Sequence, residues 1–266
     1  MVTVRVDTHA HLYDEYPLRE WCDAAARNLA LGDRICGVVI VVDRDGQDSF
    51  ARFRAEANSF GQWREAPPAV GDGVSAIGVL EWSDRRLVIV RGVQYVSQER
   101  IEVLALGVGR SVPDGAPASE LVDLIHQEGG VPCLPWSPGK WFGKRGRVVA
   151  TILNEASPRA LVLGDIAIRS LGLPPSGLLW KARRRGFPVL CGTDPLPRRE
   201  DCSLVGSFGV CFSIEQEMPD VEMLFAELIR PALCGELCGE LCGGLVQQWG
   251  WRNSPIRAIR RFISTL

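Results

Sequence analysis

The order of apolar and helical segments predicts a (β/α) barrel with an inserted antiparallel segment. Short runs rich in valine, isoleucine and leucine alternate with helical patterns along most of the chain. Continuous apolar runs of this kind are typical of parallel strands that are buried on both faces. One stretch breaks the alternation, with three strand-like runs joined by charged turns. An open doubly wound sheet is the alternative that this order leaves.

The expected elements follow one another along the chain. The apolar runs that we assign to parallel strands are residues 2–6, 37–42, 131–134, 160–163 and 189–191. The helical patterns between them are residues 17–31, 48–60, 119–127, 147–155 and 176–185. The antiparallel insertion covers residues 76–107, where "WSDRRL" and "VSQERI" predict turns. We expect the barrel to span residues 1–215 and a C-terminal helical extension to span residues 216–266.

Composition indicates an ordinary soluble α/β protein. Of the 266 residues, 46% are hydrophobic and 23% are charged. Thirty basic and thirty-two acidic residues give a net charge of −2, which offers no signal for nucleic acid or an anionic membrane. No apolar run approaches the ~18 residues that span a bilayer, and the N-terminus lacks a secretory signal. We therefore expect a cytoplasmic location and reduced thiols for the nine cysteines.

Aspartate and histidine accumulate where the expected strands end. In (β/α) barrels the active site forms at the C-terminal ends of the strands. His9 and His11 lie two residues apart in the first strand, so both imidazoles face one side and can reach a single ion. They are two of only three histidines in the chain, and we assign the third, His126, to a helix surface or core. The alternative for the pair is two barrel-lining histidines that bond to carboxylates.

Four segments resemble, in order and spacing, the successive blocks of the PHP family of polymerase-and-histidinol-phosphatase-type metal phosphoesterases. They are "VDTHAHL", "ICGVVIVVDRDG", "VIVRGVQYVSQERIEVLALG" and "VLCGTDPLP", and they cover roughly the first 200 residues. The opening histidine pair also occurs in amidohydrolases, and the strand meander after the second helix favours PHP. The resemblance implies a distorted (β/α)7 barrel, similar to a TIM barrel, that holds metal ions and hydrolyses phosphate esters.

The chain departs from the ligand pattern of the family at several positions. Arg44 follows Asp43 where the family usually has histidine, and Gln94 replaces a glutamate that bridges two metals. Leu104 stands where a histidine is frequent, and Asp194 lacks the histidine that usually follows two residues later. The His-Pro pair that is common in the family is replaced within "CLPWSPGKW". An amide brings no charge to a cation site, and Arg44 adds a positive charge.

These departures leave one mononuclear site. The resemblance and the spacing together predict His9, His11 and Asp194 as ligands of one zinc, manganese or iron ion, with Gln94 or water as the fourth. If the site is degenerate, we expect no metal. Asp43 is a candidate general base, or a partner of Arg44 or Arg91.

A basic aromatic loop, "PWSPGKWFGKRGR", follows the strand at residues 131–134. Glycine, lysine and arginine at the start of a helix suit an anionic group. We expect Lys140 and Arg145 to bind and stabilise a phosphate, with Lys144 and Arg44 nearby and Trp136 or Trp141 stacking on a sugar or base. The alternative is a solvated loop whose tryptophans cover the barrel rim. The partner implied is a small anionic ligand, and the sequence is silent on the oligomeric state.

Further polar residues have supporting roles in this interpretation. Asp7 is expected to support the metal ligands, and Asp165 and Arg169 to orient a ligand or form a structural ion pair. The repeat "LCGELCGELCGG" brings Cys234, Cys238 and Cys242 together, and we interpret it as an expansion without a metal cluster. The tail "SPIRAIRRFISTL" is expected to form a basic amphipathic helix.

Two functions of different class follow. The first is a metal-dependent phosphoester hydrolase with a reduced, mononuclear site. The second is a catalytically degenerate barrel that binds an anionic ligand or a protein. Arg44 discriminates between them: an outward Arg44 favours the enzyme, whereas an ion pair with Asp43 or Asp194 in the barrel mouth favours the binder.

Overall fold

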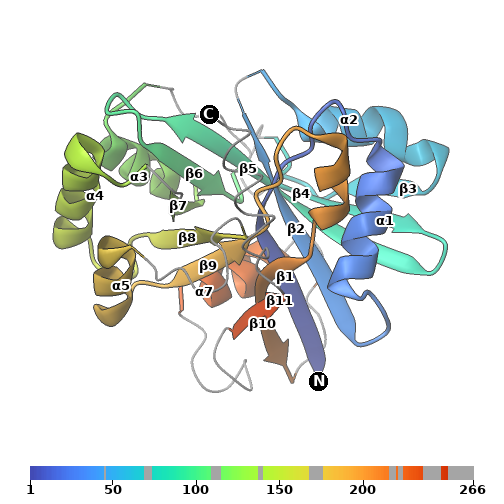
Figure 1. The fold of residues 1–266 in the computed structure, drawn as a ribbon. Helices are drawn as coiled ribbons and strands as arrows, with labels where there is room; N and C mark the ends of the chain where they lie inside the picture. Colours follow the sequence, from blue (N-terminus) through green and yellow to red (C-terminus); the bar gives the residue numbers. More distant parts are fainter. Residues whose placement is uncertain are drawn as a thin grey trace.

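The computed structural model describes residues 1–44, 46–68, 74–108, 115–136, 140–167, 176–215, 220, 224–235 and 247–250. Its strands form a nearly closed, barrel-shaped sheet with helices on the outside (Figure 1). The strands are β1 (Val2–Ala10), β2 (Ile35–Asp43), β3 (Gln62–Glu65), β4 (Ile77–Trp82), β5 (Arg85–Val96), β6 (Glu102–Leu106), β7 (Val131–Trp136), β8 (Val162–Ile166), β9 (Val189–Gly192), β10 (Phe208–Ile214) and β11 (Gln247–Gly250). The helices are α1 (Leu18–Leu29), α2 (Ser49–Glu56), α3 (Ala118–Gln127), α4 (Gly143–Glu155), α5 (Gly177–Arg184) and α7 (Arg230–Leu233), with short helical turns η1 (Ala57–Ser59), η2 (Arg199–Leu204) and η3 (Leu224–Ile229).

The sheet runs in the order β11-β10-β1-β2-β5-β6-β7-β8-β9, with β3 and β4 attached to β5. β1, β2 and β5 are parallel, as are β7, β8 and β9. The pairs β4–β5, β5–β6 and β6–β7 are antiparallel, so the predicted meander is confirmed. β9 returns to β1, where the Asp194 amide donates to the His9 carbonyl at 2.7 Å and the Thr8 hydroxyl donates to the Cys191 carbonyl at 3.0 Å. The sheet therefore closes toward a barrel, and the open doubly wound alternative is wrong.

Three strands were absent from the sequence prediction. β3 forms a short hairpin with β4, β10 pairs antiparallel with β1, and β11 pairs with β10. β10 and, beyond it, β11 therefore extend the sheet on one side of β1, in addition to the alternating strands and helices. The expected helix over 48–60 ends at Glu56, and the short turn η1 follows it.

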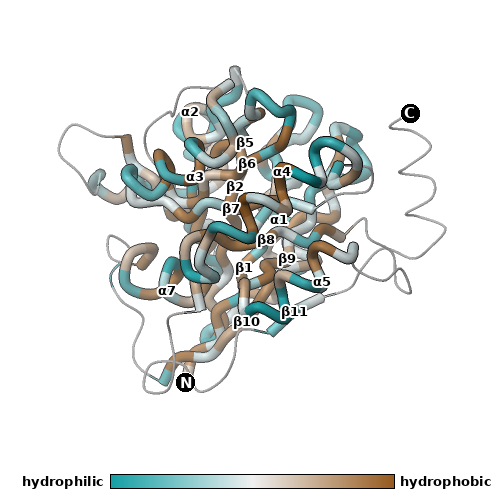
Figure 2. The backbone as a smooth tube through the Cα atoms, turned by 90° about the vertical axis from the view of Figure 1, so that its left-hand side faces the viewer, coloured by the Kyte–Doolittle hydropathy of each residue, from teal (hydrophilic) through white to brown (hydrophobic). Residues whose placement is uncertain are grey.

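The interior of the barrel is apolar because alternate residues of each strand face it. Val38, Ile40 and Val42 of β2 are fully buried there together with Val88 and Val90 of β5. The opposite faces of the strands pack on the helices, so the polar sides of the helices lie outward (Figure 2). At the C-terminal ends of β2 and β5, the side chains on this interior face therefore lie at the mouth of the barrel.

The segment formed by η3 and α7 packs against the interior side chains. Leu224, Phe225, Leu228 and Leu233 belong to the same buried cluster as the interior valines. Leu224 also lines a cavity with Val2, at the amino-terminal end of β1. This segment thus covers the end of the barrel opposite to the C-terminal strand ends.

Part of the predicted C-terminal extension lies outside the described residues. Within 216–266 the structure describes Asp220, the helical segment 224–235 and the strand β11. Cys234 is buried, whereas Cys238, Cys242 and the tail from residue 251 lie outside the described part. The longest described helix, α4, has 13 residues, and no described helix is both long and apolar enough to cross a bilayer.

Candidate metal centre

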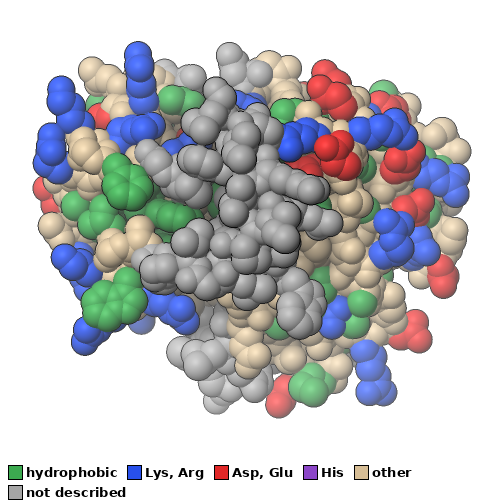
Figure 3. Space-filling model, viewed as in Figure 1, with side chains coloured by type: hydrophobic (Ala, Val, Ile, Leu, Met, Phe, Trp, Pro, Cys, Tyr) green, Lys and Arg blue, Asp and Glu red, His purple; other side chains and the backbone are tan. Residues whose placement is uncertain are grey.

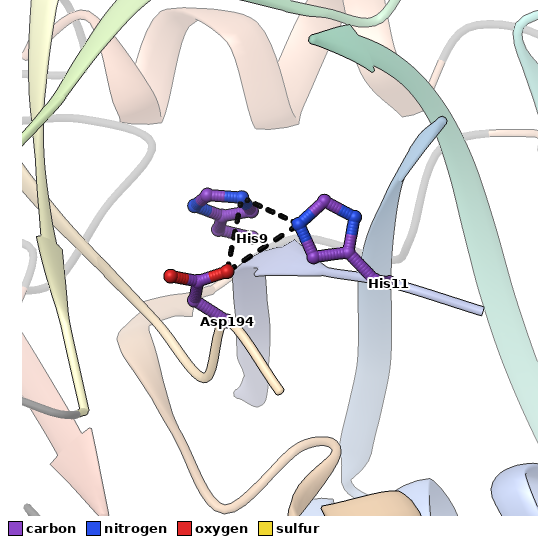
Figure 4. Close-up of side chains that lie close together, drawn as sticks. All are labelled: His9, His11 and Asp194. Atoms are coloured by element: carbon purple, nitrogen blue, oxygen red, sulfur yellow. Dashed lines mark hydrogen bonds and ion pairs between the residues drawn. The ribbon is translucent and has the colours of Figure 1, made fainter. Parts of the chain in front are cut away.

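The side chains of His9, His11 and Asp194 converge at the mouth of the barrel, where β1 meets the end of β9 (Figure 4). The Nε2 atoms of His9 and His11 lie 3.2 Å apart. Asp194 Oδ1 lies 3.3 Å from His11 Nε2 and 3.7 Å from His9 Nε2. The three predicted ligands therefore point to one position.

These separations fit a tetrahedral ion. Metal–ligand bonds of about 2.0–2.1 Å in a tetrahedral site place neighbouring ligand atoms about 3.3–3.4 Å apart. The three observed separations, 3.2, 3.3 and 3.7 Å, lie around that value. Two imidazole nitrogens and one carboxylate oxygen also suit zinc and related ions, so geometry and donor chemistry agree.

Hydrogen bonds fix the orientation of His11. Its Nδ1 atom lies 2.7 Å from the Val42 carbonyl and donates a hydrogen bond to it. Nδ1 therefore carries the proton, and Nε2 presents a lone pair to the metal position. The Trp21 indole donates to the His11 carbonyl at 3.1 Å and holds the backbone of the ligand.

His9 is neutral at neutral pH. Burial lowers the pKa of its imidazole to about 4, and the charges of His11 and Lys140 lower it further while Asp194 opposes the shift. Its Nδ1 atom is buried and has no hydrogen-bond partner among the described residues. In its neutral state, the His9 imidazole has one nitrogen with a free lone pair, which can bind a cation.

Asp7 connects the two strands that carry the ligands. Its carboxylate accepts hydrogen bonds from the Thr193 amide at 3.0 Å, the Thr193 hydroxyl at 2.6 Å and the Gly206 amide at 2.9 Å. It also lies 3.3 Å from the His9 amide, which donates to it. Burial raises the pKa of Asp7 to about 6, although all four hydrogen bonds favour the ionised form. Asp7 thus bonds backbone amides next to the ligands and not an imidazole ring.

The backbone at the third ligand is unusual. Asp194 has φ +43°, in the left-handed region that non-glycine residues rarely adopt. A Cβ atom on Gly192 would lie 2.5 Å from the His9 amide nitrogen, so only glycine allows β9 to approach β1 this closely. The hydrogen bonds of Asp7 to Thr193 keep the following Asp194 in this conformation.

The remaining candidate ligand, Gln94, comes from β5 and not from β1 or the segment after β9. Gln94 lies at the end of β5 on the face of Val88 and Val90, and it is half-buried. Its side chain makes no hydrogen bond with a described residue. Leu104 of β6 is its buried partner across the strand pair, so no second ligand faces it from there.

Asp43 faces away from the three converging ligands, whereas the exposed Arg44 side chain hydrogen-bonds the Tyr13 phenol beside His11. Asp43 follows the interior residue Val42 and faces α2, where it accepts hydrogen bonds from the amide and hydroxyl of Ser49 and lies 3.8 Å from Arg91. Of the roles expected for Asp43, the structure shows the pairing with Arg91. Arg44 is exposed and makes no ion pair with Asp43 or Asp194 among the described residues.

The basic aromatic loop divides into parts with different surroundings. Lys140 is half-buried and forms an ion pair with Glu102, and its charge acts on His9. Trp136 and Trp141 are buried in the layer between the sheet and α3 and α4, as expected for tryptophans that cover the rim.

The other cations of this loop lie on α4. Lys144 and Arg147 are exposed and line a surface hollow together with Glu99 and Glu155. Arg145 is half-buried in the first turn of α4. The structure thus brings Lys140 into the electrostatic range of the ligands and places Lys144 and Arg147 elsewhere.

Two further predictions concern residues away from the ligands. Asp165 is buried in β8, and Arg169 lies outside the described residues, so their pairing is not described. His126 bonds the Ala160 carbonyl, in agreement with the structural role expected for it.

Sequence reasoning missed two polar residues at the mouth. The Tyr13 ring lies 5.3 Å from that of His11, and burial raises the pKa of its phenol to about 12, with Asp194 adding to the shift and Arg44 opposing it. Its two-residue spacing from His11 was the available signal. The other is Glu102, the partner of Lys140, for which the sequence held no local signal.

No protein-family model matches the chain, and no curated protein matches its sequence. Among solved structures, PsfC from Pseudomonas syringae PB-5123 is similar over 100% of both chains, with a TM-score of 0.57 and 14% sequence identity. The lesion-specific endonuclease PfuEndoQ from Pyrococcus furiosus gives a TM-score of 0.49 and 15% identity, over 94% of this chain and 59% of that chain. Endonuclease Q in complex with a 27-mer duplex that has an abasic lesion at the active site gives 0.46 and 11%, over 90% and 58%. The similarity to PsfC shows a shared fold over the whole length.

Proposed function

We propose that this protein is a metal-dependent phosphoester hydrolase of the PHP type with a mononuclear site held by His9, His11 and Asp194. The observation that carries the proposal is the convergence of three donor atoms 3.2–3.7 Å apart at the C-terminal ends of β1 and β9. In (β/α) barrels this end is where catalytic residues gather. The sequence resemblance of four segments to PHP blocks supports the same class.

A divalent ion at this position would act as a Lewis acid and lower the pKa of a bound water. The chain itself contributes orientation and charge around the ion. His11 is fixed by the Val42 carbonyl, and Asp7 fixes the loop that carries Asp194. The neutral Tyr13 phenol can donate a hydrogen bond to an anionic oxygen, and the Lys140 ammonium can stabilise charge on a phosphoryl group. Gln94 lies on the interior face of β5 and would serve as a neutral fourth ligand or as a hydrogen-bond donor.

The alternative is a barrel that binds an anionic ligand or a protein without turnover. An Arg44 ion pair with Asp43 or Asp194 inside the mouth would favour this alternative. Arg44 is exposed and forms neither pair among the described residues, which supports the hydrolase.

Elemental analysis of the tag-free protein tests the metal centre. We expect about one zinc, manganese or iron ion per chain, and its loss in a His9→Ala/His11→Ala variant. His126→Ala is the matched control, because it removes the third histidine at a position that bonds only a backbone carbonyl. Absence of metal from the wild type, even after incubation with zinc or manganese, would contradict the proposal.

Turnover then separates the two functions. With metal bound, we expect hydrolysis of p-nitrophenyl phosphate or its bis-ester, and a drop of about tenfold or more in kcat/KM for Lys140→Ala. Metal binding without hydrolysis of any phosphate ester would favour the degenerate barrel.

A further inference from the structure

We infer that the outer face of α5 is a binding surface for single-stranded nucleic acid. The surface, which we call the α5 patch, consists of Arg159, Trp180, Lys181, Arg183 and Arg184. It does not depend on the proposed metal centre, whose ligands come from β1 and the segment after β9.

The α5 patch concentrates positive charge that the whole-chain composition hides. Residues 156–164 and 176–193 contain no acidic residue, whereas the net charge of the chain is −2. Arg159 lies near the end of α5, because a Cβ atom built on Gly186, two residues after Arg184, would lie 3.9 Å from its neighbour Pro158. Figure 3 shows Lys and Arg side chains around exposed hydrophobic groups over α4 and α5, with acidic side chains gathered mainly on the opposite side.

The cations of the α5 patch are not neutralised within the protein. All four are exposed, and none forms an ion pair with a described residue. Other cations, such as Lys144 and Arg147, are also exposed without an ion pair among the described residues, so the feature of the patch is that its four cations lie together. Ion pairs engage eight arginines in other parts of the described structure: Arg19, Arg52, Arg54, Arg64, Arg85, Arg86, Arg91 and Arg199. Cations that are free of internal partners can neutralise phosphates and release counterions.

An aromatic side chain lies among these cations. Trp180 is 48% exposed, although large aromatic side chains are usually buried. The Arg184 guanidinium stacks over its ring, 4.8 Å from the centroid. Paired planar groups of this kind stack on nucleobases, and every base offers a flat face to them.

A groove accompanies the aromatic group. A cavity of about 330 Å³ lies between α4 and α5 and is lined by apolar atoms of Leu153 and Leu178, with Trp180, Lys181 and Arg184 at its edge. An apolar floor with cations at the edge suits a chain of flat bases joined by phosphates. An acidic peptide would match the charge, but only nucleic acid joins a flat group to an anion in every unit of the chain. The observations therefore favour nucleic acid.

Fluorescence anisotropy with a labelled oligothymidylate tests this inference. Single-strand sites cover about 4–16 nucleotides, and the probe is longer than that. EDTA is present so that metal-dependent cleavage plays no part. We expect binding that weakens between about 50 and 200 mM salt. Lys181→Glu/Arg184→Glu should weaken it at least about tenfold and reduce the slope of log affinity against log salt by about 1.4, for two lost phosphate contacts.

Arg64→Glu/Arg86→Glu is the matched control, because it changes the net charge equally at residues that pair with Glu81 on another face. It should keep most of the affinity. Trp180→Leu should weaken binding about tenfold with an unchanged salt slope, as expected for lost stacking.

Two results would overturn the inference. Equal losses in both charge-reversal variants would show that net charge alone governs binding. Displacement of the oligonucleotide by polyglutamate of equal charge, together with an unaffected Trp180→Leu variant, would assign the surface to acidic proteins.

Discussion

Replacing Thr193 by valine should destabilise the protein and weaken metal binding together. The substitution keeps the branched shape and removes the hydroxyl that donates to Asp7 over 2.6 Å. Both residues are fully buried, so water cannot replace the lost donor. Asp7 would keep the amide bonds from Thr193, Gly206 and His9, with one fewer donor for its buried carboxylate.

The size of the effect follows from the charge of the acceptor. A hydrogen bond to a charged group contributes about 1.5–3 kcal/mol, and a buried group that loses its partner bears a penalty of similar size. We therefore expect the free energy of unfolding to fall by about 2 kcal/mol. For a chain of this size that corresponds to a Tm lower by roughly 4–8 °C. Because Thr193 precedes Asp194, metal affinity should fall about 10- to 100-fold, as for other groups that orient ligands.

Urea unfolding of the metal-free protein and zinc titration measure the two effects separately. Thr151→Val, on an exposed position of α4, is the matched control and should change stability by less than about 0.5 kcal/mol. If Thr193→Val unfolds at the wild-type urea concentration and binds zinc with wild-type affinity, Asp7 does not hold the metal position through Thr193.

Three further changes probe the same region and the core. Gly192→Ala should lower the amount of folded protein and abolish metal binding, because its Cβ would lie 2.5 Å from the His9 amide nitrogen; wild-type circular dichroism with full metal content would contradict this. Trp21→Phe should weaken zinc binding several-fold in a titration, since the indole no longer donates to the His11 carbonyl, and an unchanged affinity would show that the backbone needs no such support. Burial raises the pKa of the Cys22 thiol, so iodoacetamide at neutral pH should modify it slowly in the native protein and rapidly in urea, as peptide mass spectrometry can follow.

The positions of the buried parallel strands were predictable because such strands have a clear apolar signature. Residues 37–42 and 131–134 were expected as strands and lie within β2 and β7. β10 escaped prediction although it pairs with β1, because its pairing partner lies some 200 residues away and a short antiparallel strand carries no crossover helix to mark it.

The ligands of the proposed metal ion were predictable from the sequence, whereas the hydrogen bonds that hold these ligands in place were not. The spacing of His9 and His11 and the strand-end position of Asp194 are visible in the sequence. The hydrogen bonds of Asp7 to Thr193 and Gly206 join parts of the chain more than 180 residues apart. No local pattern encodes such contacts, since they depend on how closely β9 approaches β1. The same holds for the ion pair between Lys140 and Glu102.

The position of the three ligands at the junction of β1 and β9 gives an ion a second effect, on the mechanics of the sheet. His9 and His11 belong to the start of the chain and Asp194 follows β9, so an ion shared by them would cross-link the two strands between which the cylinder closes. Any ligand that binds only the folded form stabilises it, by about 2.7 kcal/mol at a hundred times its Kd. Chelation should then loosen this junction first, and amide exchange in β9 should rise before exchange in β2, which has hydrogen-bonded strands on both sides. A residual metal position would in this way preserve the architecture of the barrel as well as its chemistry.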